Sequence, residues 1–174
     1  MRNRARYALS TLTAVLVISG CTNTPSSEAS VKEGAQLVGA WRSKITFKSG
    51  SLAEMKNLEF LYSYNAGGTM TESSNYDEAA NSSPPAYGVW RRIDAHTFET
   101  KYLFYTTKAP SAADGEPKGT DWWPAGHGVL TETITLSDNG QTYTSTIKLA
   151  TFDKADAPVE GGGTGTGVGT RIVF

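Results

Sequence analysis

The chain has 174 residues, and its 16 Lys and Arg nearly balance its 17 Asp and Glu. This balance argues against a nucleic-acid partner, because phosphate binding needs clustered Lys and Arg. His96 and His127 lie in or beside predicted turns with no second ligand at metal spacing, so neither a metal nor a cofactor is predicted. No Ser lies in a nucleophile elbow, and no catalytic residue is predicted.

Residues 1–20 have the pattern of a signal peptide. Arg2, Arg4 and Arg6 form a basic start, and residues 8–20 form an apolar run shorter than the ~20 residues that a membrane-spanning helix needs. Loss of this segment removes three of the 16 basic residues, which leaves 13 against 17 acidic residues and a formal charge of −4. The remaining 154 residues suit one domain with a single core.

The segment ends with Ile18, Ser19, Gly20 and Cys21, an aliphatic residue and two small residues before the single Cys. This pattern resembles the lipobox of bacterial lipoproteins, which implies that Cys21 is lipidated, becomes the mature N-terminus and makes the membrane a partner. Thr22 stands where lipoproteins held at the inner membrane often carry Asp. The resemblance therefore implies a place in the cell envelope: the outer membrane, facing the periplasm, if the cell has one, and otherwise the outer face of the cell membrane. The alternatives are an ordinary secretory signal that contains a thiol and a buried structural Cys.

The next segment leads into the folded domain. Residues 22–30 are small and polar without periodicity, which predicts a flexible tether. Residues 31–37 suit one short helical turn. The predicted organisation is a signal peptide at 1–20, a lipidated tether and helical lead-in at 21–36, and a domain at 37–174.

From residue 39 onward, apolar side chains recur with a period of two between turn residues, which predicts an all-β domain of about eight strands. Asn139-Gly140 suits a tight hairpin turn, and no connection leaves room for a crossover helix. Antiparallel strands in this number usually close into an up-and-down barrel, because closure removes exposed sheet edges. A sandwich is the alternative. The predicted strands are 41–47, 58–64, 69–73, 87–93, 98–107, 127–137, 143–152 and 164–174.

Gly39-Ala40-Trp41 resembles the Gly-x-Trp motif on the first strand of lipocalins and related calycin barrels. The "GVWRR" of residues 88–92 and the "GTR" of residues 169–171 are similar to patterns in small exported bacterial lipocalin-like proteins. In lipocalins the Trp plugs one end of the barrel and an Arg packs across it. The resemblance implies that Gly39, Trp41 and Arg171 close the barrel, with a cation–π contact of ~0.5–2 kcal/mol. The alternative is that Trp41 is simply a core aromatic.

Glu132 has the parity of Leu130 and Ile134, which places a carboxylate on the apolar face of its strand. An ionised carboxylate there is costly unless it is paired. If that face is the interior, Arg91 is a candidate partner, because it shares parity with the apolar residues of its own strand. Such a pair either holds a polar group of a ligand, acts as an acid or base, or is purely structural.

The loop predicted at residues 109–126 contains Trp122 and Trp123. These two tryptophans are candidates for a lid over the open end of the barrel, for a partner patch or for a membrane-interface contact. The alternative is that they fold back over the barrel as packing.

A barrel of about eight strands either fills its interior with side chains or holds one small ligand. The leading hypothesis is a membrane-tethered protein, not an enzyme, that binds a small hydrophobic molecule. One alternative is a protein–protein interaction module or inhibitor of the cell envelope with a filled core. Another is a calycin-type cyclase or isomerase that uses Glu132 and Arg91. The candidate ligand-binding residues are Tyr62, Trp90, Arg91, Tyr102, Phe104 and Glu132.

Overall fold

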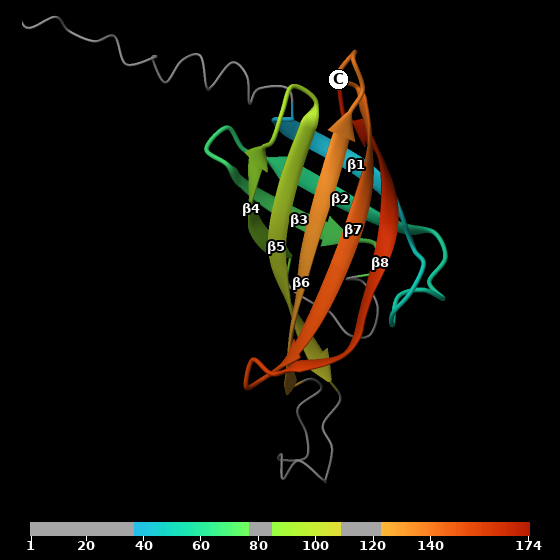
Figure 1. The fold of residues 1–174 in the computed structure, drawn as a ribbon, viewed down its shortest axis with the longest axis vertical. Coiled ribbons are helices and arrows are strands. Elements are labelled where there is room, and N and C mark those ends of the chain that lie inside the picture. The colour runs from blue at the N-terminus through green and yellow to red at the C-terminus, as the bar shows by residue number, and fades with distance from the viewer. Residues whose placement is uncertain (1–36, 77–84, 109–122) are drawn as a thin grey trace, which may run out of the picture.

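A computed structural model describes residues 37–76, 85–108 and 123–174. These residues form a closed barrel in which each strand pairs with the next and β8 returns to β1 (Figure 1). All the pairs are antiparallel, which confirms the predicted all-β class and the single up-and-down barrel and excludes the sandwich. The strands are β1 (Gly39–Phe47), β2 (Leu58–Tyr64), β3 (Thr69–Ser74), β4 (Ala86–Arg92), β5 (Thr97–Lys108), β6 (Trp123–Leu136), β7 (Thr142–Asp153) and β8 (Pro158–Arg171).

Several predictions fall on segments outside the described residues: the signal peptide, Cys21, the helical lead-in and Trp122. Within the described part of the chain, no helix is long and apolar enough to span a membrane.

Most strand starts fall within two residues of the prediction, but two strands begin at least four residues earlier than the sequence predicted. β8 starts at Pro158 and includes the glycines at 161–163, and β6 starts at Trp123, inside the predicted loop. The reason in β8 is steric: a Cβ on Gly163 would lie 1.9 Å from the backbone oxygen of Ser49. The glycine run therefore lets β8 continue alongside the segment that follows β1, where a larger residue would clash.

Along each strand, side chains point alternately into the barrel and towards the solvent. In β1 the side chains of Trp41, Ser43, Ile45 and Phe47 are buried, while those between them are exposed. β8 differs because the residues on its interior face include a row of glycines, Gly165, Gly167 and Gly169. Their missing side chains leave space inside the barrel for the larger residues of β1 and β7.

One end of the barrel is closed around Trp41, whose side chain is fully buried. Its Nε1 donates to the Leu37 oxygen at 2.9 Å, and the Tyr143 ring lies 5.1 Å away. The guanidinium carbon of Arg171 lies 4.3 Å from the centroid of the indole, and its Nη1 donates to the Val38 oxygen at 2.7 Å. These contacts fill and close this end of the barrel.

Candidate ligand site

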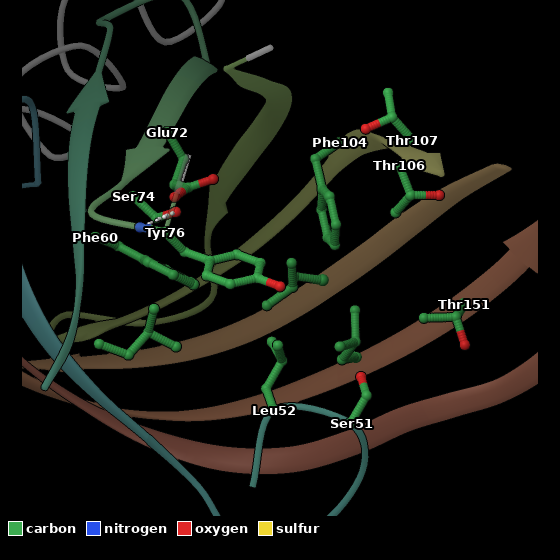
Figure 2. A pocket seen from close by; sticks show the side chains of 13 residues that line it. Ser51, Leu52, Phe60, Glu72, Ser74, Tyr76, Phe104, Thr106, Thr107 and Thr151 are labelled. Carbon is green, nitrogen blue, oxygen red and sulfur yellow. Dashed lines mark hydrogen bonds between the residues drawn. The ribbon is translucent and has the colours of Figure 1, made fainter. Parts of the chain in front are cut away.

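A cavity of about 250 Å³ lies at the end opposite Trp41. Its wall begins with Ser51 and Leu52, which follow the far end of β1, and continues with Leu58 at the start of β2. Figure 1 shows that β5 to β8 extend past the shorter strands on this side of the barrel. Figure 2 shows the side chains around the space. The remaining lining residues are Phe60, Glu72, Ser74, Tyr76, Phe104, Thr106, Thr107, Leu130, Leu149 and Thr151.

The deeper part of the lining is apolar and buried. Leu58, Phe60, Leu130 and Leu149 belong to the core, and Phe104 packs against it. Sites for drug-sized ligands usually measure ~300–1,000 Å³, so a space of about 250 Å³ suits a smaller molecule.

The rest of the lining carries oxygen atoms. Glu72, on β3, is a buried carboxylate in the wall, and the hydroxyls belong to Ser51, Ser74, Tyr76, Thr106, Thr107 and Thr151. The Thr107 hydroxyl is buried without a hydrogen-bond partner in the structure. Glu72 was not predicted from the sequence, although it lies two residues after Met70, which places both side chains on the interior face of β3. That pattern was the available signal.

A layer of buried polar side chains lies between the cavity and the closed end. Glu132 is two residues along β6 from Leu130 and is fully buried. Desolvation by burial raises the pKa of Glu132 to about 7, and the nearby hydroxyls of Ser145 and Tyr62 partly oppose this rise. Neither of its oxygens meets hydrogen-bond geometry with a partner, so the carboxylate is costly to ionise.

The same layer contains other hydroxyls. The Tyr62 and Tyr102 hydroxyls are 2.8 Å apart and share a hydrogen bond. Burial, together with the charge of Glu132, raises the pKa values of the Tyr62 and Tyr102 phenols well above the ordinary value for tyrosine. The buried hydroxyls without a hydrogen-bond partner belong to Ser43, Tyr64, Thr100, Tyr143 and Ser145.

The six candidate ligand residues do not form one site. Phe104 lines the cavity, whereas Tyr62, Trp90, Tyr102 and Glu132 are buried inside the barrel but do not line it. The Trp90 Nε1 donates to the Asn65 oxygen at 2.9 Å, which holds this indole towards the closed end.

Arg91 requires a correction, because it lies on the outer face of β4 and cannot pair with Glu132. Its Nε donates to Oε2 of Glu99 at 2.8 Å in an exposed ion pair. The interior face of β4 carries Ala86, Gly88 and Trp90. The outer face carries the apolar side chains of Tyr87, Val89 and the following Ile93, which are all more than half exposed. Because Arg91 shares their parity, the sequence pattern wrongly placed it on a buried face.

Trp123, one of the two candidate lid residues, is the first residue of β6 and is partly buried. It pairs with Lys108 of β5, and its Nε1 is buried without a hydrogen-bond partner. Its role as a lid stays a prediction, as does that of Trp122.

Among the described residues, no group of three His, Cys, Asp or Glu side chains is placed to hold a metal ion. No protein-family model matches the chain, and no curated protein matches it. The barrel and its cavity are therefore the features that bear on function.

Proposed function

We propose that this protein is an exported, lipid-anchored barrel that binds one small, largely apolar molecule. The observation that carries the proposal is the cavity of about 250 Å³ with an apolar floor, at the end of the barrel opposite Trp41. Binding in an already formed apolar space avoids the cost of reorganising the protein.

The size of the space sets the expected affinity. A buried methylene contributes ~0.8 kcal/mol, so a six-carbon molecule gains about 5 kcal/mol. This free energy corresponds to a dissociation constant on the order of 0.1–1 mM, with tighter binding where polar groups also pair. The first probe should therefore be small, and 1-hexanol is suitable.

Titration calorimetry with 1-hexanol tests the proposal. Leu149→Trp fills the cavity from a buried position on β7, and Lys148→Trp places the same indole on the exposed face next to it. We expect the wild-type protein and Lys148→Trp to bind hexanol and Leu149→Trp to bind at least about tenfold more weakly. Circular dichroism checks that all three are folded. Equal binding by the two variants would place the ligand elsewhere.

The lipid anchor is a separate part of the proposal and rests on the residues around Cys21. We expect the full chain, produced in a bacterial cell with labelled palmitate, to carry the label and sediment with membranes. Cys21→Ala should lose both properties, because the thioether cannot form. A wild-type chain that is exported without the label would reject lipidation.

An interaction module is the second candidate function. Two observations favour it. Buried side chains occupy the interior between the cavity and the closed end, and the apolar side chains of Tyr87, Val89 and Ile93 are exposed on the outer wall. Absence of hexanol binding by the folded wild-type protein would favour it. The third hypothesis, an enzyme using Glu132 and Arg91, loses its residue pair because the two side chains lie on opposite faces of the wall.

A further inference from the structure

We propose that the molecule bound in the cavity is an alcohol, whose hydroxyl group donates a hydrogen bond at a notch in the wall formed by Ser51, Thr151 and Gly161. This inference rests on the proposed function, because it names the class of ligand for the same cavity. The three residues are called the Gly161 notch below.

An irregularity in the pairing of β7 with β8 builds the notch. The register shifts between Leu149 and Thr151, and Gly161 has a φ of 120°, a backbone conformation that residues with a side chain rarely adopt. A Cβ on Gly161 would lie 3.5 Å from Oγ1 of Thr151 and 3.6 Å from Oγ of Ser51. Because glycine has no Cβ, its side chain takes up none of the space beside these two hydroxyl groups. Both hydroxyl groups belong to the cavity lining, and Figure 2 shows them on the same part of it.

The two hydroxyl groups of the notch can accept a hydrogen bond from a ligand but cannot donate one without losing a bond of their own. Oγ of Ser51 donates to the Gly161 oxygen at 2.9 Å, and Oγ1 of Thr151 donates to the Val159 oxygen at 2.9 Å. Because a carbonyl oxygen only accepts, each hydroxyl hydrogen is committed to the backbone. Among the described residues, no group donates to either hydroxyl oxygen. A ligand that pairs with the notch therefore has to supply the hydrogen.

The rest of the described lining also offers few hydrogen-bond donors. Its other polar side chains are hydroxyl groups and the carboxyl group of Glu72, and none carries an N–H group. An ether or ketone oxygen only accepts hydrogen bonds, so it cannot pair with the notch. An alcohol has the hydrogen that the notch requires.

The apolar floor of the cavity lies within reach of the notch. Leu149 and Thr151 both line the cavity and are two residues apart on β7, which corresponds to about 7 Å along a strand. Leu52, the residue after Ser51, also lines the cavity. The alkyl chain of a short alcohol can therefore contact these leucines while its hydroxyl group reaches the notch.

Two isomers, 1-hexanol and 1-methoxypentane, test the inference on the full-length protein by titration calorimetry at pH 7. They contain the same atoms, but the ether has no hydroxyl hydrogen. We expect the alcohol to bind about three- to tenfold more tightly, which is the usual effect of one hydrogen bond. A cavity without the notch would take the ether at least as well, because the alcohol loses more hydrogen bonds to water on binding.

Thr151→Val keeps the shape of the side chain and removes one acceptor. It should bring the dissociation constants of the alcohol and the ether close together while ether binding is kept. Thr146→Val is the matched control, because it removes a hydroxyl group from an exposed position on the same strand. Ser51→Ala removes the other acceptor from a residue outside the strands and should reduce the preference in the same way. Circular dichroism checks the fold of all three variants.

An alcohol preference that is lost in Thr151→Val or Ser51→Ala and kept in Thr146→Val would support the inference. Ether binding as tight as that of hexanol to the wild type would overturn it and leave the proposed function standing. So would an alcohol preference that persists in both Thr151→Val and Ser51→Ala, or one that Thr151→Val and Thr146→Val reduce equally. Failure of both probes to bind the folded protein would overturn the proposed function as well.

Discussion

Glu132 places a carboxyl group in the interior of the barrel, where none of the described buried side chains is basic. Its neighbours on the adjacent strands are Thr100 of β5 and Ile147 of β7, and Tyr62 approaches from β2. None of them carries a positive charge. The neutral form of the carboxyl group is therefore favoured, and its pKa rises to about 7.

This raised pKa predicts that stability falls as the pH increases. Unfolding returns the carboxyl group to its ordinary pKa of 4.5, so between pH 4.5 and about 7 the folded state binds more protons than the unfolded state. The contribution of Glu132 is fully present below pH 4.5 and is lost as the pH rises through 7. The expected loss in the free energy of unfolding is about 3 kcal/mol.

Urea unfolding of the wild type and of Glu132→Gln at pH 4.5, 6, 7 and 8 measures this loss. Gln has nearly the same shape and no charge, so its stability relative to the wild type should improve as the pH rises. Glu160→Gln serves as the control and should follow the wild type, because its residue is exposed. If the free energies of unfolding of the wild type and Glu132→Gln changed in parallel with pH, the buried carboxyl group would not titrate in this range.

At the scale of the element, β8 shows how glycine shapes the interior. A Cβ on Gly169 would lie 2.2 Å from the ring of Tyr143, which itself packs against Trp41. The glycine therefore allows an aromatic side chain from β7 to lie over β8. An interior-facing residue of ordinary size at this position would push the ring out of the closed end.

We predict that Gly169→Ala destabilises the barrel. Overpacking against Tyr143 should lower the free energy of unfolding by about 1–3 kcal/mol, although alanine is ordinarily better than glycine inside a strand. Thr170→Ala changes the next residue, which is exposed, and should alter stability by less than about 0.5 kcal/mol. Chemical denaturation at one pH compares the two variants. Equal stability would mean that Tyr143 can move aside without cost.

At the scale of the whole molecule, alternation of apolar residues was sufficient to predict eight antiparallel strands and their closure, because period two is a local property of the chain. The choice of the buried face is not local. In β4 the exposed Tyr87 and Val89 made the outer wall look like an interior face, and Arg91 was misplaced with them.

The candidate site was harder to predict for a related reason. Leu130 lines the cavity and Glu132, on the same face of β6, lies deeper, because the extent of filling depends on side chains that meet from all around the barrel. Leu149 and Glu72 come from strands far apart in the sequence, and no spacing along the chain links them.

The most direct test of a barrel that is closed at one end and binds its ligand at the other is a methyl NMR titration of the wild-type protein with 1-hexanol. We expect saturable chemical-shift changes at Leu58, Leu130 and Leu149, which line the cavity, and little change at Ile134 and Leu136, which lie deeper in the core. Changes centred on Ile134 and Leu136, or no saturable change at the cavity residues, would contradict the account.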